Sequence, residues 1–353
     1  MSSIANVKPY FSTKMGNAYL GDSLDILPKI EAQSVDLICT SPPFALERKK
    51  AYGNVAESEY VKWFMQFTVE FRRILKPKGS LVVDIGGAWI KGQPVRSLYH
   101  FQLVIDLCKP IEDGGCGFNL AQELYWYNPA KLPTPAEWVT VRRERVKDAV
   151  DTVWWLSLDK HPKANNRRIL KAYSDSQKKL MVNGYKAKKR PSEHDISTKF
   201  GRDNKGAIPP NLINGFDDTS HKMGDLVPVN LIVAANTSSN DAYLRACRVH
   251  NIKPNPARFP SALPEFVIGL CTEKGDVVLD PFAGSNMTGY VAEQMGRHWI
   301  AIELNEEYLK GAKFRFDYDI KKVAEAESIA KTMKQVQIKI DEGLNSVSHT
   351  KSA

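Results

Sequence analysis

Cysteine is scarce in this sequence, and the spacing of the few cysteines excludes two common uses. The 353 residues contain five of them, with no C-x-x-C pair: Cys39, Cys108, Cys116, Cys247 and Cys271. An odd and widely spaced set argues against a disulfide framework and against a zinc site. We therefore expect free thiols in a reducing cytoplasm and, because no other cluster of metal ligands is evident, no metal.

Long apolar runs are also missing. No stretch approaches about 18 apolar residues, the length of a membrane-spanning helix. The N-terminal sequence MSSIANVKPYFSTK contains no apolar core of the kind that a signal peptide has. These absences predict a cytoplasmic protein with no membrane partner. The G-x-G-x-x-G pattern of dinucleotide folds is absent as well, so a pyrophosphate ligand is not implied.

The composition is that of a globular protein with a basic balance. Apolar residues make up 43% of the chain and charged residues 25%, which excludes collagen-like, disordered and coiled-coil classes. The length exceeds what one hydrophobic core usually serves, so we expect two domains or one domain with a large insertion. The net charge of +9 favours a polyanionic partner.

Most of this charge falls in one segment. Residues 157–222 hold 15 lysines and arginines against seven acids, a net charge of +8. The segment lacks hydrophobic periodicity and contains turn formers such as Asn183-Gly184, Pro209-Pro210 and Asn214-Gly215. Composition alone favours a solvated surface loop and a nucleic-acid surface equally. The polar residues 343–353 are expected to form a flexible tail.

Strand-like and helix-like segments alternate on both sides of the basic segment, which predicts a mostly parallel α/β sheet. Apolar and β-branched runs predict strands at 35–39, 80–85, 123–127, 152–156, 276–279 and 298–304. Helical spacing predicts a helix over 57–76, ended by Pro77-Lys78-Gly79, and another over 286–295, capped by Gly296. A long amphipathic helix is expected to start near Asn305.

One candidate site lies in the second half. A turn of small residues from Asp280 to Ser285 connects a strand to a helix, so a ligand can approach the backbone there. Glu303 ends the following strand, where a carboxylate can bind both hydroxyls of a ribose. This pattern favours a nucleoside site. The alternative is an ordinary strand-turn-helix with a surface glutamate.

Two further segments contain candidate functional residues. Ser41-Pro42-Pro43-Phe44 follows a strand, so the Ser41 hydroxyl and the Pro42 carbonyl can accept hydrogen bonds from an exocyclic amine, and Phe44 can stack on its base. A plain Pro-Pro turn is the alternative. Asp22, in Gly21-Asp22-Ser23, is either a helix N-cap or a contact to an adenine amino group.

Together these segments resemble the beta-group DNA amino-methyltransferases, in which the catalytic segment comes first, the cofactor segment last and target recognition between them. Ser41-Pro42-Pro43-Phe44 is similar to the catalytic motif and Asp280-Pro-Phe-Ala-Gly-Ser285 to the cofactor loop. Pro256–Pro260 with Leu263-Pro264-Glu265 resembles the cover of the cofactor's methionine end, and Val153–Ser157 the strand that closes the target-base pocket. The resemblance covers roughly residues 20–156 and 251–310.

The resemblance implies a Rossmann-like S-adenosylmethionine methyltransferase fold interrupted by a basic target-recognition insertion. The implied boundaries are 1–156 for the catalytic half, 157–250 for the target-recognition region, 251–342 for the cofactor-binding half and 343–353 for the tail. The implied cofactor is S-adenosylmethionine, with contacts from Asp22, Asp280, Pro281, Phe282, Gly284, Ser285 and Glu303. Phe44 and one of Trp154 and Trp155 would stack on the target base, although a core role is the stronger interpretation for both tryptophans.

The implied reaction is methylation of N4 of a cytosine flipped out of double-stranded DNA. A Ser-Pro-Pro-Phe motif is associated with cytosine, whereas N6-adenine methylation by the same fold is the alternative. The family commonly works in restriction–modification beside a separate endonuclease. Two other classes stay open: methylation of a small molecule or a protein glutamine, and a DNA-binding module without catalysis. The sequence indicates neither the recognition site nor the oligomeric state.

Overall fold

A computed structural model describes residues 4–45, 55–184, 202–213, 242–258 and 260–316. Within these ranges the strands form one nine-stranded sheet in the order β1-β2-β9-β8-β3-β4-β6-β5-β7. Their bounds are β1 Phe11–Ser12, β2 Gly16–Leu20, β3 Val35–Thr40, β4 Leu75–Ile85, β5 Asn119–Tyr127, β6 Val150–Ser157, β7 Leu212–Ile213, β8 Val277–Asp280 and β9 His298–Glu303. No helix in the described ranges is long and apolar enough to cross a membrane.

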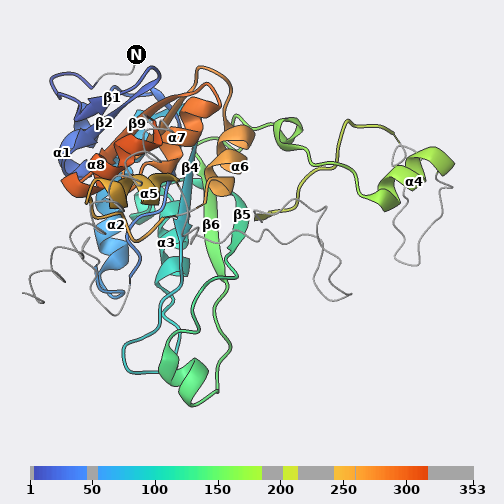
Figure 1. The fold of residues 1–353 in the computed structure, drawn as a ribbon, viewed down its shortest axis with the longest axis horizontal. Helices are drawn as coiled ribbons and strands as arrows, with labels where there is room; N and C mark the ends of the chain where they lie inside the picture. The colour runs from blue at the N-terminus through green and yellow to red at the C-terminus, as the bar shows by residue number, and fades with distance from the viewer. Residues whose placement is uncertain (1–3, 46–54, 185–201, 214–241, 259, 317–353) are drawn as a thin grey trace, which may run out of the picture.

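The five strands β2, β9, β8, β3 and β4 are parallel to one another, whereas β6 is antiparallel to both of its neighbours. The helices are α1 Ser23–Ile26, α2 Tyr60–Ile74, α3 Tyr99–Cys108, α4 Asp175–Asn183, α5 Ala242–Val249, α6 Ala262–Cys271, α7 Met287–Gln294 and α8 Glu306–Ala312. Figure 1 shows the sheet between two layers of helices. The expected Rossmann-like α/β fold with a mostly parallel sheet is confirmed.

Alternation along the strands divides the core into two layers, because successive side chains point to opposite faces of a sheet. In β3, Ile38 packs on the face covered by α2 and α3, whereas its neighbours Leu37 and Cys39 pack on the face covered by α6, α7 and α8. All three residues are buried. Continuous apolar runs of this kind are what strands covered on both faces require.

The strand order reverses between β3 and β8. The chain leaves β8 through α7 toward β9, and it leaves β3 through α2 toward β4, which lies on the opposite side. In open α/β sheets a ligand crevice forms at such a reversal, outside the carboxyl ends of the two strands. These two ends are Thr40 and Asp280.

Several boundaries differ from the prediction, among them those around Pro77-Lys78-Gly79 and the end of the helix expected from Asn305. α2 ends at Ile74 and β4 begins at once, so Pro77-Lys78-Gly79 lies inside the strand. The strand tolerates this proline because β3 pairs with Leu75 and next with Ser80, which leaves the residues between them unpaired with β3. The helix expected from Asn305 extends only to Ala312 and continues as a 3₁₀ turn, with its further part outside the described residues.

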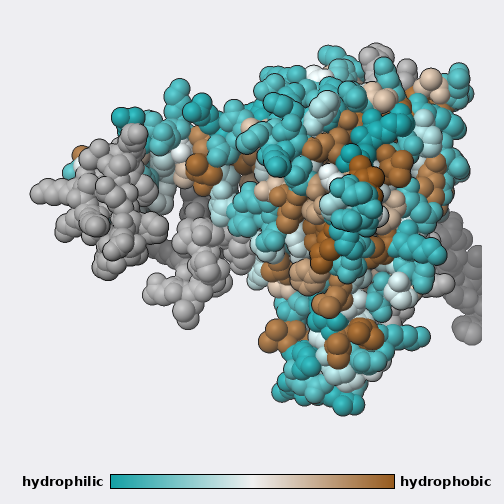
Figure 2. Space-filling model, turned by 180° about the vertical axis from the view of Figure 1, so that it is seen from behind, coloured by the Kyte–Doolittle hydropathy of each residue, from teal (hydrophilic) through white to brown (hydrophobic). Residues whose placement is uncertain are grey.

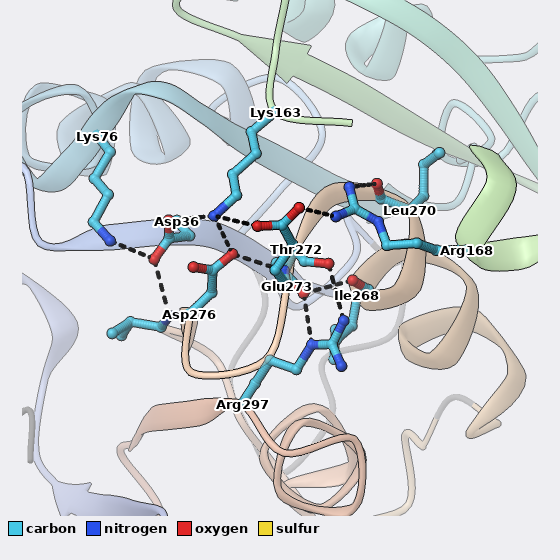
Figure 3. A network of polar contacts seen from close by, with 11 residues as sticks. Asp36, Lys76, Lys163, Arg168, Ile268, Leu270, Thr272, Glu273, Asp276 and Arg297 are labelled. Atoms are coloured by element: carbon cyan, nitrogen blue, oxygen red, sulfur yellow. Dashed lines mark hydrogen bonds and ion pairs between the residues drawn. The ribbon is translucent and has the colours of Figure 1, made fainter. Parts of the chain in front are cut away.

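Both ends of the predicted target-recognition region pack on the body. Lys163 binds the Asp276 carboxylate at 2.6 Å and lies 3.7 Å from that of Asp36, while Arg168 binds Glu273 at 2.8 Å (Figure 3). At the other end, α5 contacts α8, and its Tyr243 is buried. The described part that projects from the body is therefore shorter than 157–250 and includes α4 (Figure 1).

Candidate active site

The site is built around a buried carboxylate at the reversal of the strand order. Asp280 accepts hydrogen bonds from the Thr40 hydroxyl at 2.7 Å, the Thr288 hydroxyl at 2.8 Å and the Phe282 amide at 3.1 Å. Burial raises the pKa of Asp280 to about 6, although these three donors oppose the rise. The bonds join the ends of β3 and β8 and the start of α7 into one rigid edge.

Glu303 ends β9 beside this edge. Its Oε2 accepts the Gly284 amide at 2.7 Å and its Oε1 the Asn305 amide at 2.8 Å. Burial raises the pKa of Glu303. Each carboxylate oxygen can accept a second hydrogen bond, so both oxygens keep capacity for hydroxyl donors. This donor and acceptor pattern fits the ribose of a nucleoside.

The turn between β8 and α7 leaves no room for a side chain at Gly284. The residue has a φ of +52°, and an added Cβ would lie 2.1 Å from Nδ2 of Asn255. Glycine is therefore required on both conformational and steric grounds. Asn255 directly precedes Pro256–Pro260, the segment expected to cover the cofactor, in which Phe259 lies outside the described residues.

Three other residues that are predicted to contact the cofactor, Asp22, Pro281 and Ser285, make hydrogen bonds within the protein. Asp22 accepts the Leu24 amide at 2.9 Å, which is the N-cap role, while its side chain stays exposed. The Pro281 carbonyl accepts the Ser23 hydroxyl at 2.5 Å. Ser285 is held by Arg315, which binds both its hydroxyl and its carbonyl.

Phe282 does not point freely into the site. Its ring centroid lies 5.0 Å from that of Phe67 and 5.6 Å from that of Trp63, so it packs on α2. The cofactor loop is thereby fixed to the helix that follows the catalytic segment in the chain.

The catalytic segment follows directly from Thr40. Ser41 and Phe44 are half-buried, and Pro42 is buried. Asp84, next to the last residue of β4, is 2% exposed, and neither of its carboxylate oxygens has a hydrogen bond of ordinary geometry. Burial and the charge of Asp151 raise the pKa of Asp84, whereas the nearby Ser41 hydroxyl lowers it. An underused buried acceptor beside a hydroxyl is unusual enough to indicate function.

A second buried acid completes this cluster. Asp151 lies at the start of β6 and forms an ion pair with Lys131. Burial raises the pKa of Asp151, although Lys131 opposes the rise. Repulsion between the two buried carboxylates therefore raises the pKa of Asp84, and the single ammonium group of Lys131 opposes this rise.

Gly86 sets the position of the Phe44 ring. A Cβ at Gly86 would lie 2.7 Å from Cε2 of Phe44 and 2.8 Å from Oδ1 of Asp151. The buried Tyr99 hydroxyl donates to the Gly86 carbonyl and fixes this loop from the side of α3. The Phe44 ring thus occupies space that only a glycine backbone leaves open.

The two tryptophans of β6 are both buried in the core, in keeping with the stronger interpretation of them. Trp155 donates to the Ser80 hydroxyl at 3.0 Å and packs in one core layer, and Trp154 packs in the other, with 8% and 3% exposed. Because β6 runs antiparallel to β4, its first residues lie beside the end of β4 at Ile85, and Asp151 lies next to Gly86.

The sequence proposes Ser41, Phe44, Asp280, Gly284 and Glu303 as site residues, and the structure places all five at one edge of the sheet. Asp84 and Asp151 are not among the residues predicted from the sequence. An acid near the end of the predicted strand 80–85, directly before Gly86-Gly87, is a signal that points to Asp84. Nothing comparable marks Asp151. Among the residues that the structure describes, no group of three possible metal ligands occurs.

The fold and the site define an α/β protein that binds a nucleoside-like ligand beside a Ser-Pro-Pro-Phe segment. Residues 35–314 match the model of the N6_N4_Mtase family, described as DNA methylase. The chain therefore belongs to this family of DNA methylases. The expected class of enzyme, a DNA methyltransferase that uses S-adenosylmethionine, is confirmed.

Individual relatives agree with this assignment. The type II methyltransferase M.PvuII of Proteus hauseri is 46% identical over 312 residues, covering 88% of this chain and 86% of the relative. The DNA adenine methyltransferase YhdJ of Escherichia coli K12 is 25% identical, covering 89% of this chain and 86% of the relative. A solved PvuII DNA methyltransferase, described as cytosine-N4-specific, matches with a TM-score of 0.67 and 40% identity over 91% of this chain and 94% of its own.

Proposed function

We propose that this protein transfers a methyl group from S-adenosylmethionine to N4 of a cytosine in double-stranded DNA. The observation that carries the proposal is the junction between Thr40 and Asp280, which sets the Ser41–Phe44 segment beside the loop that holds Glu303. The choice of cytosine is supported by the 46% identity to M.PvuII and the match to the cytosine-N4-specific structure. N6-adenine methylation is the alternative, supported by the more distant adenine enzyme.

The residues divide into two groups by task. Glu303, Gly284 and the turn after Asp280 hold the cofactor, which supplies an electrophilic methyl group when it is bound. Ser41 and the Pro42 carbonyl accept hydrogen bonds from the two N–H groups of the target amine. These bonds free the nitrogen lone pair, which is otherwise delocalised into the ring, for in-line attack at about 3–3.5 Å.

Methylation leaves the nitrogen with one proton too many, and Asp84 is positioned to take it. As the N–C bond forms, the amine proton moves to the Ser41 oxygen and the Ser41 hydroxyl proton moves to the Asp84 carboxylate. A buried carboxylate with a raised pKa and no other hydrogen bond accepts a proton more readily than an exposed one. Asp151 and Lys131 set the charge that Asp84 experiences.

A base within a duplex cannot reach this edge of the sheet, so the cytosine must be flipped, at a cost of a few kcal/mol. Stacking on Phe44 offsets that cost by about 1–3 kcal/mol. The projecting part of residues 157–250 supports a role in target recognition. Restriction–modification, with a companion endonuclease acting separately, is supported by relatives named type II methyltransferases.

Transfer of a labelled methyl group to duplex DNA, followed by nucleoside analysis, tests the proposal. N4-methylcytosine is expected, and N6-methyladenine would contradict the choice of base. Calorimetric titration with S-adenosylmethionine distinguishes an enzyme from a DNA-binding module, since the module would give no heat. Sequencing that reports both the methylated base and its position then defines the recognition site.

A further inference from the structure

A second basic projection lies outside the predicted target-recognition region. It consists of two loops, residues 86–98 after β4 and residues 128–149 between β5 and β6, which we call the basic arm. Figure 1 shows it below the sheet, separate from the projection that carries α4. The arm contains seven lysines and arginines against three acids, a net charge of +4.

The two loops of the arm are tied to each other. Arg96 forms an ion pair with Asp148, and its guanidinium lies 5.0 Å from the centre of the Trp89 ring. Arg145 of one loop donates to the Pro94 carbonyl of the other at 3.0 Å. These contacts hold the two loops of the arm together.

The root of the arm adjoins the proposed active site. Lys131, near the start of the second loop, is the ion-pair partner of Asp151, and Gly86, at the start of the first, packs against Phe44. DNA whose flipped base lies at Phe44 must therefore pass close to this arm. Phosphates next to the flipped nucleotide would be the groups that the arm meets.

Several of the arm's charges are not neutralised. Lys91 and Arg143 are exposed and make no hydrogen bond or ion pair within the described residues. Arg145 and Lys147 bind carbonyl oxygens and keep further N–H donors free. By contrast, Lys163 and Arg168, which belong to the basic segment 157–222, are neutralised by acids of the body.

The backbone at Arg143 supports a functional position. Its φ is +56°, a conformation that residues other than glycine, asparagine and aspartate rarely adopt. Arg143 lies two residues after the π-helical turn Glu137–Val141, and its side chain is exposed and does not belong to the hydrophobic core. The fold does not need an arginine at this place, since glycine would suit the backbone better.

We propose that the basic arm binds the DNA backbone beside the target base, with Lys91, Arg143, Arg145 and Lys147 facing phosphates. The proposal rests on the proposed function. The arm exposes several separate apolar side chains, which are compatible with contacts to sugars: Val95, Leu98, Leu132, Val141 and Val146. In Figure 2 the lobe below the body is mostly hydrophilic with separate apolar patches, which differs from the continuous apolar surface of a protein–protein contact.

The test is the salt dependence of duplex DNA binding, measured by fluorescence anisotropy with a labelled duplex. The double variant Arg143→Gly/Lys91→Gln should weaken binding, and its slope of log K against log salt should fall by about 0.9 for each phosphate that the protein no longer neutralises. Because glycine suits a positive φ, Arg143→Gly should not lower thermal stability, so a folding defect would not explain the weaker binding. The control Lys29→Gln/Lys274→Gln removes two exposed charges from the amino edge of the sheet and should leave the slope unchanged.

The outcomes separate the two proposals. If the wild-type protein neither binds duplex DNA nor methylates it, the proposed function fails. If the wild type does both and the arm variant binds with an unchanged slope, the arm proposal alone is overturned. A slope that falls equally in the control variant would also overturn it, since the effect would then reflect total charge.

Discussion

The Thr40 hydroxyl donates a hydrogen bond to the Asp280 carboxylate at 2.7 Å, across 240 residues of sequence. This bond joins the end of the strand that carries the catalytic segment to the end of the strand that carries the cofactor loop. Its acceptor is 2% exposed. The order in which the two segments occur in the chain therefore does not affect the site, because the sheet brings their ends together.

Protonation of Asp280 should make stability depend on pH. Burial raises its pKa from the usual 3.8 to about 6, so between these values the folded protein binds more protons than the unfolded chain. The contribution of Asp280 is therefore largest below pH 4 and falls by about 3 kcal/mol as the pH rises to above 6. Urea unfolding of wild type and Asp280→Asn across this range measures it.

The difference in unfolding free energy between these two proteins should decrease as the pH rises. Asp175→Asn serves as the control, since this aspartate side chain is 89% exposed. A difference that stays constant with pH would show that Asp280 keeps an ordinary pKa in the folded protein.

Ser41 and Asp84 should act as a unit. We expect Ser41→Ala and Asp84→Asn each to lower the rate of methyl transfer by about 10²-fold or more, because each interrupts removal of the amine proton. The double variant should be little worse than either single one. Cofactor affinity should change less than turnover, since neither side chain contacts Glu303 or Gly284. Single-turnover methyl transfer and calorimetric titration measure the two quantities. An unchanged rate for Ser41→Ala would remove this hydroxyl from the mechanism.

Asp151 should set the acid limb of the pH–rate profile. Its charge raises the pKa of Asp84, so Asp151→Asn should lower that pKa and move the acid limb to lower pH. The ammonium of Lys131, left without its partner, would act in the same direction. Single-turnover rates between pH 5 and 8 record the shift. A limb that moves to higher pH would contradict the assignment of Asp84 as proton acceptor.

The fold was predictable because its signals are local. The strand at 35–40 and the helix at 287–294 follow from apolar runs and from caps at Asn286 and Gly296, which the structure shows. Only some residues of the candidate active site were predictable from the sequence. Which residue of β6 lies beside Gly86 depends on the antiparallel pairing of β6 with β4, a long-range property, so nothing in the sequence marks Asp151.

The sequence also does not reveal which charged side chains are paired in the folded protein. The count in residues 157–222 treats every lysine and arginine alike, but Lys163 and Arg168 bind acids that lie far away in the sequence. The basic arm has a smaller excess spread over two separate loops, and no single window of sequence reveals it. Pairing in three dimensions decides which charges are free.

Gly86→Ala should disturb the pocket without affecting the cofactor loop. The added Cβ would lie 2.7 Å from the Phe44 ring, so either the ring or the loop must move, at a cost of about 1–3 kcal/mol. The rate of methyl transfer by the Gly86→Ala variant should fall as well. Comparing Gly86→Ala in the wild-type and Phe44→Ala backgrounds isolates the clash, because the cost should shrink when the ring is absent. Equal costs in both backgrounds would place the conflict at Asp151 instead.

The ion pairs of Lys163 in Figure 3 should stabilise the folded protein. Lys163 faces the carboxylates of Asp276, Asp36 and Glu273 at 2.6, 3.7 and 3.8 Å, and so connects the start of the projecting segment to β3 and to the turn before β8. Lys163→Met keeps the aliphatic stem but leaves three acids with less compensation. We expect a loss of about 1 kcal/mol, which lowers the melting temperature by about 2–4 °C, since the side chain is partly exposed. Lys178→Met is the matched control, because its ion pair with Asp175 is exposed and lies within one helix. If both variants melt at the same temperature, Lys163 contributes no more than a surface charge, and other contacts, such as the ion pair between Arg168 and Glu273, hold the start of the projecting segment.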